Sequence, residues 1–539
     1  MLGLLTALTL IATPGPASVL VLGNKSIAKS QQLARTYQRA RDIPDAQICL
    51  VQTSSKSDVD MDTFTMSVLP QVRECIRKQN LADRIDTFVI VKGMPMRVQW
   101  SIDGTRRTVS FAAALMIADS TYLDGRPFLG TAPGVPRNCG GAPCYGARWV
   151  NPFREAKFGP GWNKIVGDIH WRLRLATMIT GRTFADAAKL ISSATTAEAR
   201  PMAGGNFLFM NGGDRARSSM DFQYDAVMDE LNQRGFFETE RIDYEPNLTG
   251  ERIASFLVGT LSLGLAIEGN EFLPGSLVDN LTSYGAVPQN FAETGEVQVS
   301  VARWIAKGVG GVHGATAEPL SDSFPNRRFL IDYVDGMTLS QAFYRRMPFV
   351  YWQNLVLGDP LLAPYARRPN VVISGLEHGE NVKGSRQIRI QAFDEEQRGI
   401  HSLSVYVNGA KWRESAGELI EDCLTLAPTN SAQILAVAQI DGFGDLYDQY
   451  LPKGWSSKTV SFSPGPQDCS ASEVDAGMLV DTGEDDDTEK SSSDGGPVEA
   501  KTPQSMTSQC SCRVEQSPKS SLSSVWFFLL LLLRRRTSS

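Results

Sequence analysis

The chain has 539 residues, with 53 Lys and Arg, 59 Asp and Glu and only four His. Domains usually run to roughly 100–200 residues, so this length predicts more than one. The net charge of −6 argues against a nucleic-acid partner, which requires a basic face, and four His argue against a His-rich metal centre. No run of about 20 apolar residues occurs, so the sequence predicts no ordinary membrane-spanning helix.

The amino terminus has the pattern of a secretory signal peptide. The apolar stretch Leu2–Ala12 is followed by the small-residue segment Thr13–Ala17. No Lys or Arg precedes the apolar stretch, which leaves a buried first strand as the alternative. We predict that residues 1–17 are the signal peptide, that cleavage falls near Ala17, and that the mature chain is exported.

Strands and helices then alternate along the chain. Continuous apolar runs at Ser18–Leu22, Ile48–Val51 and Thr87–Val91 predict strands, and Ile27–Ala40 and Met61–Lys78 have helical spacing. This order predicts a mostly parallel sheet flanked by helices on both faces. Ligands of such sheets lie beyond the carboxyl ends of the strands.

The segments after these strands contain neither common phosphate-binding loop, G-x-G-x-x-G or G-x-x-x-x-G-K-[ST]. We therefore expect no nucleotide and no other cofactor. Lys92 and Asp103 follow the third strand and are candidate residues of a ligand cleft. Residues 101–168 are rich in Gly and Pro and are predicted to form loops or a cap.

Later segments extend the α/β region to residue 367. Helices are predicted at 170–180, 184–193 and 219–234, and strands at 206–210 and 238–244. The pattern of residues 253–264 fits either a helix or a strand.

Eight cysteines agree with export. Cys139 and Cys144 share a loop rich in Gly and Pro, and their short spacing favours a disulfide. Half of a Cys-based metal site is the alternative, but no second cysteine pair with similar spacing supports it, so we expect no metal. Pairing of Cys144 with His170 as a catalytic dyad is a weaker possibility than the disulfide.

Several segments carry a family resemblance. They resemble an uncharacterised family of secreted bacterial proteins that have a caspase/gingipain-like α/β domain. The resemblance covers most of residues 18–366, and the segments that carry it are Asp83–Pro95, Phe272–Ser276, Ala302–Pro319, Gly336–Tyr344 and Trp352–Leu361. It implies that residues 18–367 form a caspase/gingipain-like domain.

The Gly358-Asp359-Pro360 ending is also similar to the end of gingipain-type cysteine peptidases, in which an immunoglobulin-like domain and a C-terminal secretion signal follow. The resemblance implies a His-Gly at one strand end and a Cys at the next, because the imidazole must reach the thiol. The matching positions lie near Thr260–Gly264 and Leu281–Gly285, and they hold neither His nor Cys. We therefore expect no catalytic Cys–His dyad.

Other residues are weaker candidates. Ser283 is a candidate nucleophile with His313 as its base, although a lone Ser and a lone His are more often structural. Glu318 and Asp322 follow a predicted strand end and are candidate cleft residues. Asp359 is a further cleft candidate, with a side-chain acceptor in a tight turn as the alternative.

From Pro369 the hydrophobic pattern changes to the alternation typical of half-buried strands. Asn408-Gly409 is typical of a tight hairpin turn. We predict an immunoglobulin-like β-sandwich over residues 368–465, with Cys423 as its only cysteine.

The remaining chain is predicted to be a disordered spacer followed by a C-terminal sorting segment. Residues 466–509 are predicted to be disordered, since ten acidic residues and one basic residue lie between Ser470 and Ala500. In residues 510–539, Cys510 and Cys512 precede the apolar segment Val525–Leu533, which is too short to cross a bilayer, and an arginine cluster follows it. The cluster consists of Arg534, Arg535 and Arg536.

This order of Cys, apolar segment and Arg cluster resembles the C-terminal sorting signals of bacterial envelope proteins, most closely the myxobacterial type. The resemblance implies processing near the Cys, an envelope sorting machinery as partner, contact with the membrane before processing, and display on the cell surface. We thus expect a surface-anchored, non-catalytic binding or structural component with an unidentified partner or ligand. The alternative is a hydrolase that uses an unrecognised nucleophile in the same cleft.

Overall fold

The computed structural model describes residues 14–469 except 103, 132–136, 140–141, 145–150, 153, 155–162, 200–203, 236–237, 293–295 and 441–451. Asp103, the signal-peptide stretch Leu2–Ala12 and the sorting residues from Cys510 onward lie outside the described residues. Within the described residues, no helix is both long and apolar enough to cross a membrane.

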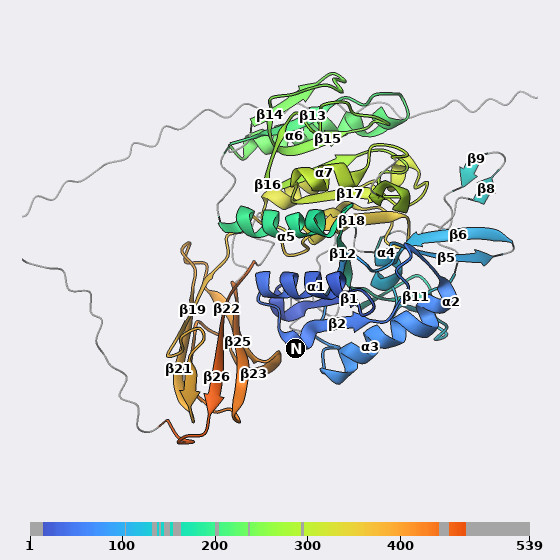
Figure 1. Ribbon diagram of the computed structural model, residues 1–539. Helices are drawn as coiled ribbons and strands as arrows, with labels where there is room; N and C mark the ends of the chain where they lie inside the picture. The colour runs from blue at the N-terminus through green and yellow to red at the C-terminus, as the bar shows by residue number, and fades with distance from the viewer. Residues whose placement is uncertain are drawn as a thin grey trace, which may run out of the picture. The chain divides into compact units, whose positions relative to one another are not determined.

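A ten-stranded sheet organises the chain up to about residue 366, with the strand order β14-β13-β15-β16-β17-β18-β12-β4-β1-β2 (Figure 1). The sheet is mostly parallel and helices cover it, as the alternation of strands and helices predicts. Its amino-terminal strands are parallel to one another and comprise β1 (Val19–Asn24), β2 (Ile48–Val51), β4 (Thr87–Val91) and β12 (Leu175–Ile179). The helices between them are α1 (Ala28–Ala40), α3 (Leu69–Lys78) and, after β12, α5 (Phe184–Ala199).

Residues 170–180 form strands, β11 (Ile169–Arg172) and β12, so the predicted helix there is wrong. All five residues of β12 are buried, because the strand lies between β4 and β18 in the middle of the sheet. A strand buried on both faces has a continuous apolar sequence, which periodicity cannot distinguish from a buried helix.

The other half of the sheet is built from later residues. Five parallel strands are followed by β18 (Asn354–Gly358), which is antiparallel to its neighbour β17. The five are β13 (Asn206–Met210), β14 (Glu238–Ile242), β15 (Arg252–Val258), β16 (Glu271–Asn280) and β17 (Gly311–Ala315). The accompanying helices are α6 (Tyr224–Gln233), α7 (Val301–Lys307), α8 (Phe329–Val334) and α9 (Leu339–Arg346). The undecided segment 253–264 thus contains a strand, β15.

The region expected to form loops or a cap, residues 101–168, contains regular structure as well. The hairpin of β5 (Arg97–Ile102) and β6 (Thr105–Ser110) is followed by the buried helix α4 (Phe111–Met116). A second hairpin, β8 (Arg137–Cys139) and β9 (Ala142–Cys144), holds the two cysteines of the predicted disulfide. Their side chains lie outside the described part of the structure, so that pairing stays a prediction.

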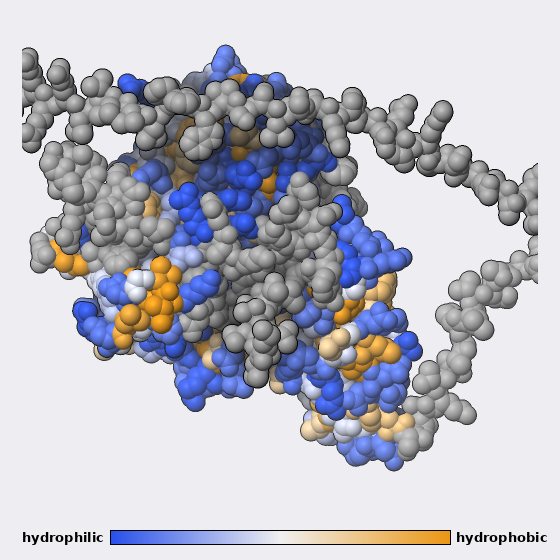
Figure 2. Space-filling view, turned by 180° about the vertical axis from the view of Figure 1, so that it is seen from behind, coloured by the Kyte–Doolittle hydropathy of each residue, from blue (hydrophilic) through white to orange (hydrophobic). Residues whose placement is uncertain are grey.

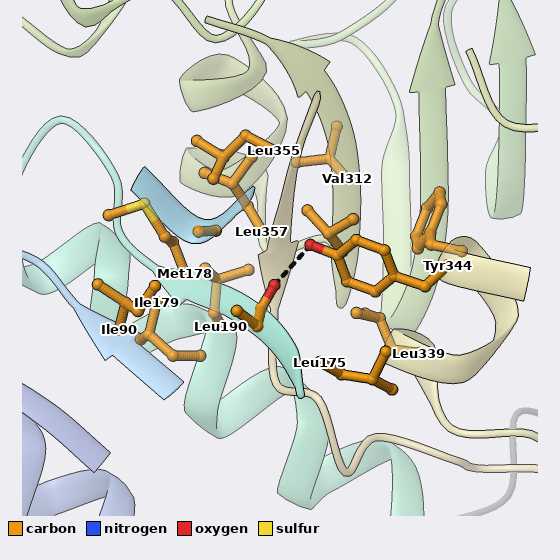
Figure 3. Close-up of a cluster of buried hydrophobic side chains, with 14 of the residues drawn as sticks. Ile90, Leu175, Met178, Ile179, Leu190, Val312, Leu339, Tyr344, Leu355 and Leu357 are labelled. Carbon is orange, nitrogen blue, oxygen red and sulfur yellow. Dashed lines mark hydrogen bonds between the residues drawn. The ribbon is translucent and has the colours of Figure 1, made fainter. Parts of the chain in front are cut away.

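The two halves of the sheet share one hydrophobic core (Figure 3). Met178 of β12 packs in the same cluster as Leu355 and Leu357 of β18, and Tyr344 of α9 closes it. The buried Tyr344 hydroxyl donates a hydrogen bond of 2.6 Å to the carbonyl of Ala176. Because a buried polar group is costly without a partner, this bond lets a tyrosine lie in the core.

Two further sheets form a second folded region around a core of their own. One contains β19 (Asn370–Ser374), β21 (Arg386–Phe393) and β24 (Leu419–Leu424). The other contains β20 (Asn381–Lys383), β26 (Lys453–Ser463), β25 (Thr429–Ile440), β22 (Ile400–Val407) and β23 (Ala410–Ser415). Asn408 and Gly409 join β22 to β23 with φ of 48° and 82°, which confirms the predicted hairpin.

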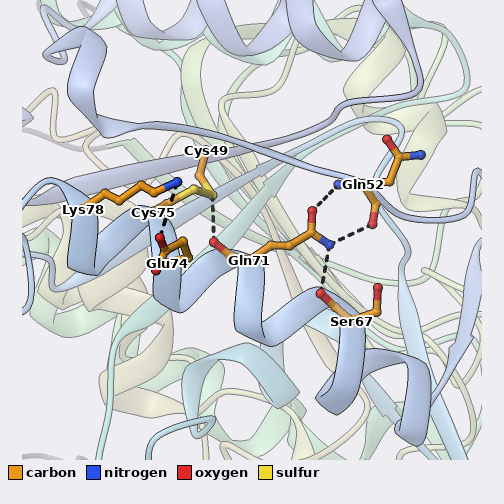
Figure 4. Close-up of a disulfide and its surroundings, with 7 residues drawn as sticks. All are labelled: Cys49, Gln52, Ser67, Gln71, Glu74, Cys75 and Lys78. Carbon is orange, nitrogen blue, oxygen red and sulfur yellow. Dashed lines mark hydrogen bonds and ion pairs between the residues drawn. A yellow bond between two sulfur atoms is a disulfide. The ribbon is translucent and has the colours of Figure 1, made fainter.

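Two disulfides cross-link the described residues. Cys49 of β2 bonds to Cys75 of α3 (Figure 4). Cys423 of β24 bonds to Cys469, a residue that the sequence analysis assigned to the spacer. The β-sheet region therefore has an internal cysteine pair, which was missed because one partner lies after the last strand.

On the face shown in Figure 2, hydrophilic residues make up most of the described surface, and hydrophobic residues lie in small separate patches. The exposed large hydrophobic side chains include Met66 at 80% and Phe222 at 78% exposure.

Candidate functional site

His313 lies in the middle of β17 and is fully buried. Its Nδ1 is 2.8 Å from Asp279 Oδ1, and its Nε2 is 3.1 Å from Asn354 Oδ1. Asn354 Nδ2 donates to the carbonyl of Ser323 at 3.0 Å, so the amide oxygen faces the ring. Both ring nitrogens therefore lie against buried side-chain oxygens, and neither is exposed to a substrate.

Asp279, at the end of β16, joins His313 to Arg327. Its other carboxylate oxygen accepts a hydrogen bond from Arg327 Nη1, and both residues are buried. Burial by itself would raise the pKa of the Asp279 carboxyl, but Arg327 and then His313 outweigh it and hold this pKa below its usual value. The result is a buried ion cluster of Asp279, His313 and Arg327 that links β16, β17 and the segment before α8.

Ser283 follows β16 and does not pair with His313. Its hydroxyl donates to Glu318 Oε1 at 3.1 Å, in the exposed segment that follows β17. The nitrogens of His313 are both occupied by other residues, so the candidate Ser283–His313 pair is not formed. Sequence alone missed this because the bonding partners of His313 lie 34 and 41 residues away.

Tyr284 lies beside the same carboxylate. Partial burial, the negative charge of Glu318 and a hydrogen bond to it raise the pKa of the Tyr284 hydroxyl. Ser283, Tyr284 and Glu318 thus form a polar group at the carboxyl ends of β16 and β17, which we call the Ser283 cluster. Its two hydroxyls share the Glu318 carboxylate as their acceptor.

The two strand ends that match a His–Cys dyad are neighbours in the sheet, since β15 pairs with β16. The Thr260 amide donates to Asn280 Oδ1 at 2.9 Å, and Asn280 Nδ2 donates back to the Thr260 carbonyl at 3.2 Å. The Thr260 hydroxyl donates to the carbonyl of Ser262 at 3.0 Å. These residues connect two strand ends and offer no activated nucleophile.

Asp322, predicted as a cleft residue, lines a cavity of about 360 Å³. Its wall comes from the segment before α6, the segment between β17 and α8, and the end of α9. We call it the Phe222 pocket, and the lining side chains used below are Arg154, Phe222, Gln223, Asp322, Asn326 and Arg346. It adjoins the end of β16, because Leu281 packs against Met220 and Phe324 of the pocket wall.

Among these lining residues, only Asp322 is a cleft residue predicted from the sequence. The pocket joins segments more than a hundred residues apart, such as Gln223 and Arg346. A lone Phe222 in a polar sequence gave no signal of a site.

Lys92 and Asp359 do not join this group. The Lys92 ammonium lies after β4, donates to the Gly181 carbonyl at 2.6 Å and stands 5.8 Å from the Phe184 ring. Burial lowers its pKa, against the opposing charge of Asp186. The prediction that Asp359 is a cleft residue is wrong. Asp359 is fully buried after β18 and accepts hydrogen bonds from the Tyr37 hydroxyl at 2.7 Å and from Arg41 Nε at 2.5 Å.

Asp359 also accepts the amide of Leu361 at 2.9 Å, so the tight-turn alternative is the one observed. Within the described residues, no group of three or more His, Cys, Asp or Glu is arranged to hold a metal ion.

No protein-family model and no curated protein matches the chain. Among solved structures, the fibronectin(III)-like modules of CbhA from Clostridium thermocellum are 14% identical with a TM-score of 0.15, over 21% of this chain and 52% of theirs. The endo-beta-1,4-mannanase from Thermotoga petrophila is 8% identical with a TM-score of 0.15, over 83% of this chain and 79% of its own. Neither likeness is strong enough to carry an argument.

Proposed function

We propose that the protein is an exported, cell-surface-anchored binding protein. In this proposal a caspase/gingipain-like α/β domain that lacks the Cys–His dyad is followed by an immunoglobulin-like β-sandwich. A mostly parallel sheet with one antiparallel pairing, between β17 and β18, and a separate region of two sheets around one core support this domain assignment. Cys510, Cys512 and the arginines 534–536 would serve the envelope sorting machinery.

The observation that best supports a non-catalytic function is the burial of His313 and the contacts of its ring nitrogens. A general base must lie within hydrogen-bond reach of the proton that it abstracts, and the fully buried ring nitrogens of His313 contact Asp279 and Asn354 instead. The strand ends that match the gingipain-type dyad hold Thr260 and the segment after Asn280, whose polar groups bond to one another. A binding role needs neither nucleophile nor base.

A peptide-library cleavage assay with and without a thiol alkylator tests this proposal. We expect no cleavage above background in either arm. Cleavage that alkylation abolishes would show that a cysteine acts as nucleophile and would overturn the non-catalytic reading.

A hydrolase is the second candidate, and one contact favours it. Ser283 Oγ lies 3.1 Å from Glu318 Oε1, within the range in which a carboxylate can take the proton of an attacking hydroxyl. If this reading is correct, cleavage of an ester or peptide substrate resists thiol alkylation and is lost in both Ser283→Ala and Glu318→Gln. Ser192→Ala, which removes an exposed hydroxyl on α5, is the matched control and should leave the rate unchanged.

A further inference from the structure

We infer that the Phe222 pocket binds a saccharide. The inference rests on the proposed binding function and gives it a ligand class. The pocket's volume of about 360 Å³ is within the range of about 300–1,000 Å³ that small-molecule sites occupy. Its position beyond the ends of β16 and β17 is where parallel sheets bind their ligands.

Two amide side chains of the pocket are oriented by the backbone. Gln223 Oε1 accepts the amide of Arg327 at 2.9 Å, and Asn326 Oδ1 accepts the amide of Arg328 at 3.0 Å. The oxygen end of each amide is thereby fixed, which leaves the NH₂ end as the donor for a ligand. Fixed donors lose little conformational entropy when a ligand binds.

Acceptors and hydroxyls complete the polar lining. Asp322 is exposed and supplies a carboxylate, and Ser219 and Ser321 supply hydroxyls that can donate or accept. A sugar hydroxyl also donates and accepts at one atom. A wall that alternates amide donors with carboxylate and hydroxyl groups therefore suits a ligand that presents several hydroxyls.

The charged side chains of the pocket lie near groups of opposite charge. Arg346 is bound through Nε and Nη2 to Asp332, at 2.5 and 2.8 Å. Arg154, the other lining cation, faces a pocket that also contains the Asp322 carboxylate. Asp332 also pairs with Arg345 at 4.0 Å, so the charged groups do not select one sign of ligand charge, and the hydroxyl-binding groups define the ligand class.

The rim of the pocket has an exposed aromatic ring. Phe222 is 78% exposed, and Phe324 and Phe349 also contribute to the lining. Such exposure of a large apolar side chain beside fixed polar groups is typical of a binding surface. The C–H face of a sugar ring can pack on the Phe222 ring while its hydroxyls meet the polar wall.

The loop that carries Asp322 is held in a strained conformation. Leu320 has φ of 69°, a left-handed value that costs a non-glycine residue of the order of 1–3 kcal/mol. The Trp352 indole N–H donates to the Pro319 carbonyl at 2.7 Å, and the Ser323 hydroxyl donates to the Leu320 carbonyl at 2.9 Å. These bonds fix the loop next to the pocket, as a site built before its ligand arrives requires.

Calorimetric titration tests this inference. The probes are neutral oligosaccharides of the cello-, manno-, xylo- and chito- series, added to the full chain. We expect at least one series to bind with Kd below about 1 mM, and Phe222→Ala and Asp322→Asn each to weaken that binding about tenfold or more. Met66→Ala is the matched control, because Met66 is 80% exposed and does not line the pocket, and it should bind like wild type.

Each other outcome overturns the inference in a distinguishable way. Absence of binding by all four series, or binding that Phe222→Ala leaves unchanged, removes the saccharide site. Binding of a peptide library that depends on Phe222 keeps the binding function and replaces the ligand class. Cleavage of a bound oligosaccharide keeps the site but ends the non-catalytic function. Unchanged melting temperatures of the variants show that lost binding is not lost folding.

Discussion

At the scale of single residues, His313 shows that a histidine in a sequence typical of a catalytic site can have a structural role. The sequence His313-Gly314 has the appearance of a catalytic element, yet the ring is buried between Asp279 and Asn354. Arg327 shares Asp279, so one buried carboxylate bonds to both side chains inside the sheet. A buried charge of this kind is tolerated only with its partners in place.

Removal of the Asp279 charge should therefore be severely destabilising. We expect Asp279→Asn to lower the free energy of unfolding by about 3–5 kcal/mol, because Arg327 and His313 lose their shared counter-charge in the interior. Urea denaturation measures this. Asp225→Asn is the control, since its carboxylate is 73% exposed and its pair with Arg241 is worth at most about 1 kcal/mol. Equal effects of the two substitutions would contradict the ion cluster.

The lowered pKa of the Asp279 carboxyl predicts that the stability of the protein depends on pH in the acid range. The pKa of Asp279 in the folded protein lies below its ordinary value of 3.8, so its stabilising contribution is present above pH 3.8 and is lost as the pH falls through the lower folded value. Unfolding measured between pH 2 and pH 5 should show wild type losing its advantage over Asp279→Asn at the acid end. A constant difference across this range would contradict the shifted pKa.

At the scale of elements, each disulfide covalently links a strand to another part of the chain. Cys49 and Cys75 connect β2, at the edge of the large sheet, to α3 across 26 residues (Figure 4). Cys423 and Cys469 connect β24 to the end of the described chain across 46 residues. Both restrict the unfolded chain more than the folded one.

Loss of either disulfide should lower the free energy of unfolding by an amount that depends on the length of the loop that it closes. We expect Cys49→Ala with Cys75→Ala to cost about 3 kcal/mol, and Cys423→Ala with Cys469→Ala about 4 kcal/mol. Thermal unfolding under oxidising conditions measures both. Under a strong reductant, wild type should fall to the level of the variants, and a wild type indifferent to reductant would argue against cross-linked cysteines.

At the scale of the whole molecule, the α/β region contacts the β-sheet region through a small apolar cluster and through polar groups. Asp42, in the turn after α1, accepts from Gln433 Nε2 through its carbonyl at 2.9 Å and from the Ser457 hydroxyl through its carboxylate at 2.5 Å. Asp86, just before β4, interacts with Lys453 at the start of β26. These contacts make the stability of the two regions interdependent.

Asp86 gives this contact a pH dependence opposite to that of Asp279. Burial raises the pKa of the Asp86 carboxyl to about 6, against the opposing effects of Lys453 and of hydrogen bonds from Thr87 and Ser18. A carboxyl with a raised folded pKa favours the folded state most below its unfolded value of 3.8 and loses that contribution as the pH rises through about 6.

We therefore expect Asp86→Asn to gain stability relative to wild type as the pH rises from 5 to 8. Thermal unfolding of both proteins across this range gives the difference. A difference that does not change with pH, or that changes in the other direction, would show that Asp86 is ionised in the folded protein throughout.

The contacts of residues 15–17 bear on where the predicted signal peptide is cleaved. Ala17 is only 6% exposed and packs with Tyr406 and Leu435, and the Pro16 carbonyl accepts Gln47 Nε2 at 2.8 Å. Cleavage at Ala17 would remove these contacts, so we propose cleavage before Gly15, together with processing near Cys512.

Intact-mass measurement of protein extracted from the cell surface tests both ends. We expect a chain that begins at or before Gly15 and ends near Cys512. A folded surface protein that begins at Ser18 would restore the original site, and recovery of the unprocessed chain from the cytosol would contradict export.

The sequence by itself determined the local structure, because the residues that decide it are neighbours in the chain. The apolar run Thr87–Val91 forms β4, and Asn408-Gly409 forms a hairpin turn, as predicted. Only the tertiary structure decided which side chains meet. It turned residues 175–179 into a central strand, buried Asp359 under α1, and gave His313 partners from β16 and β18 instead of Ser283. The Phe222 pocket joins segments distant in sequence, and no local pattern encodes their distance in space.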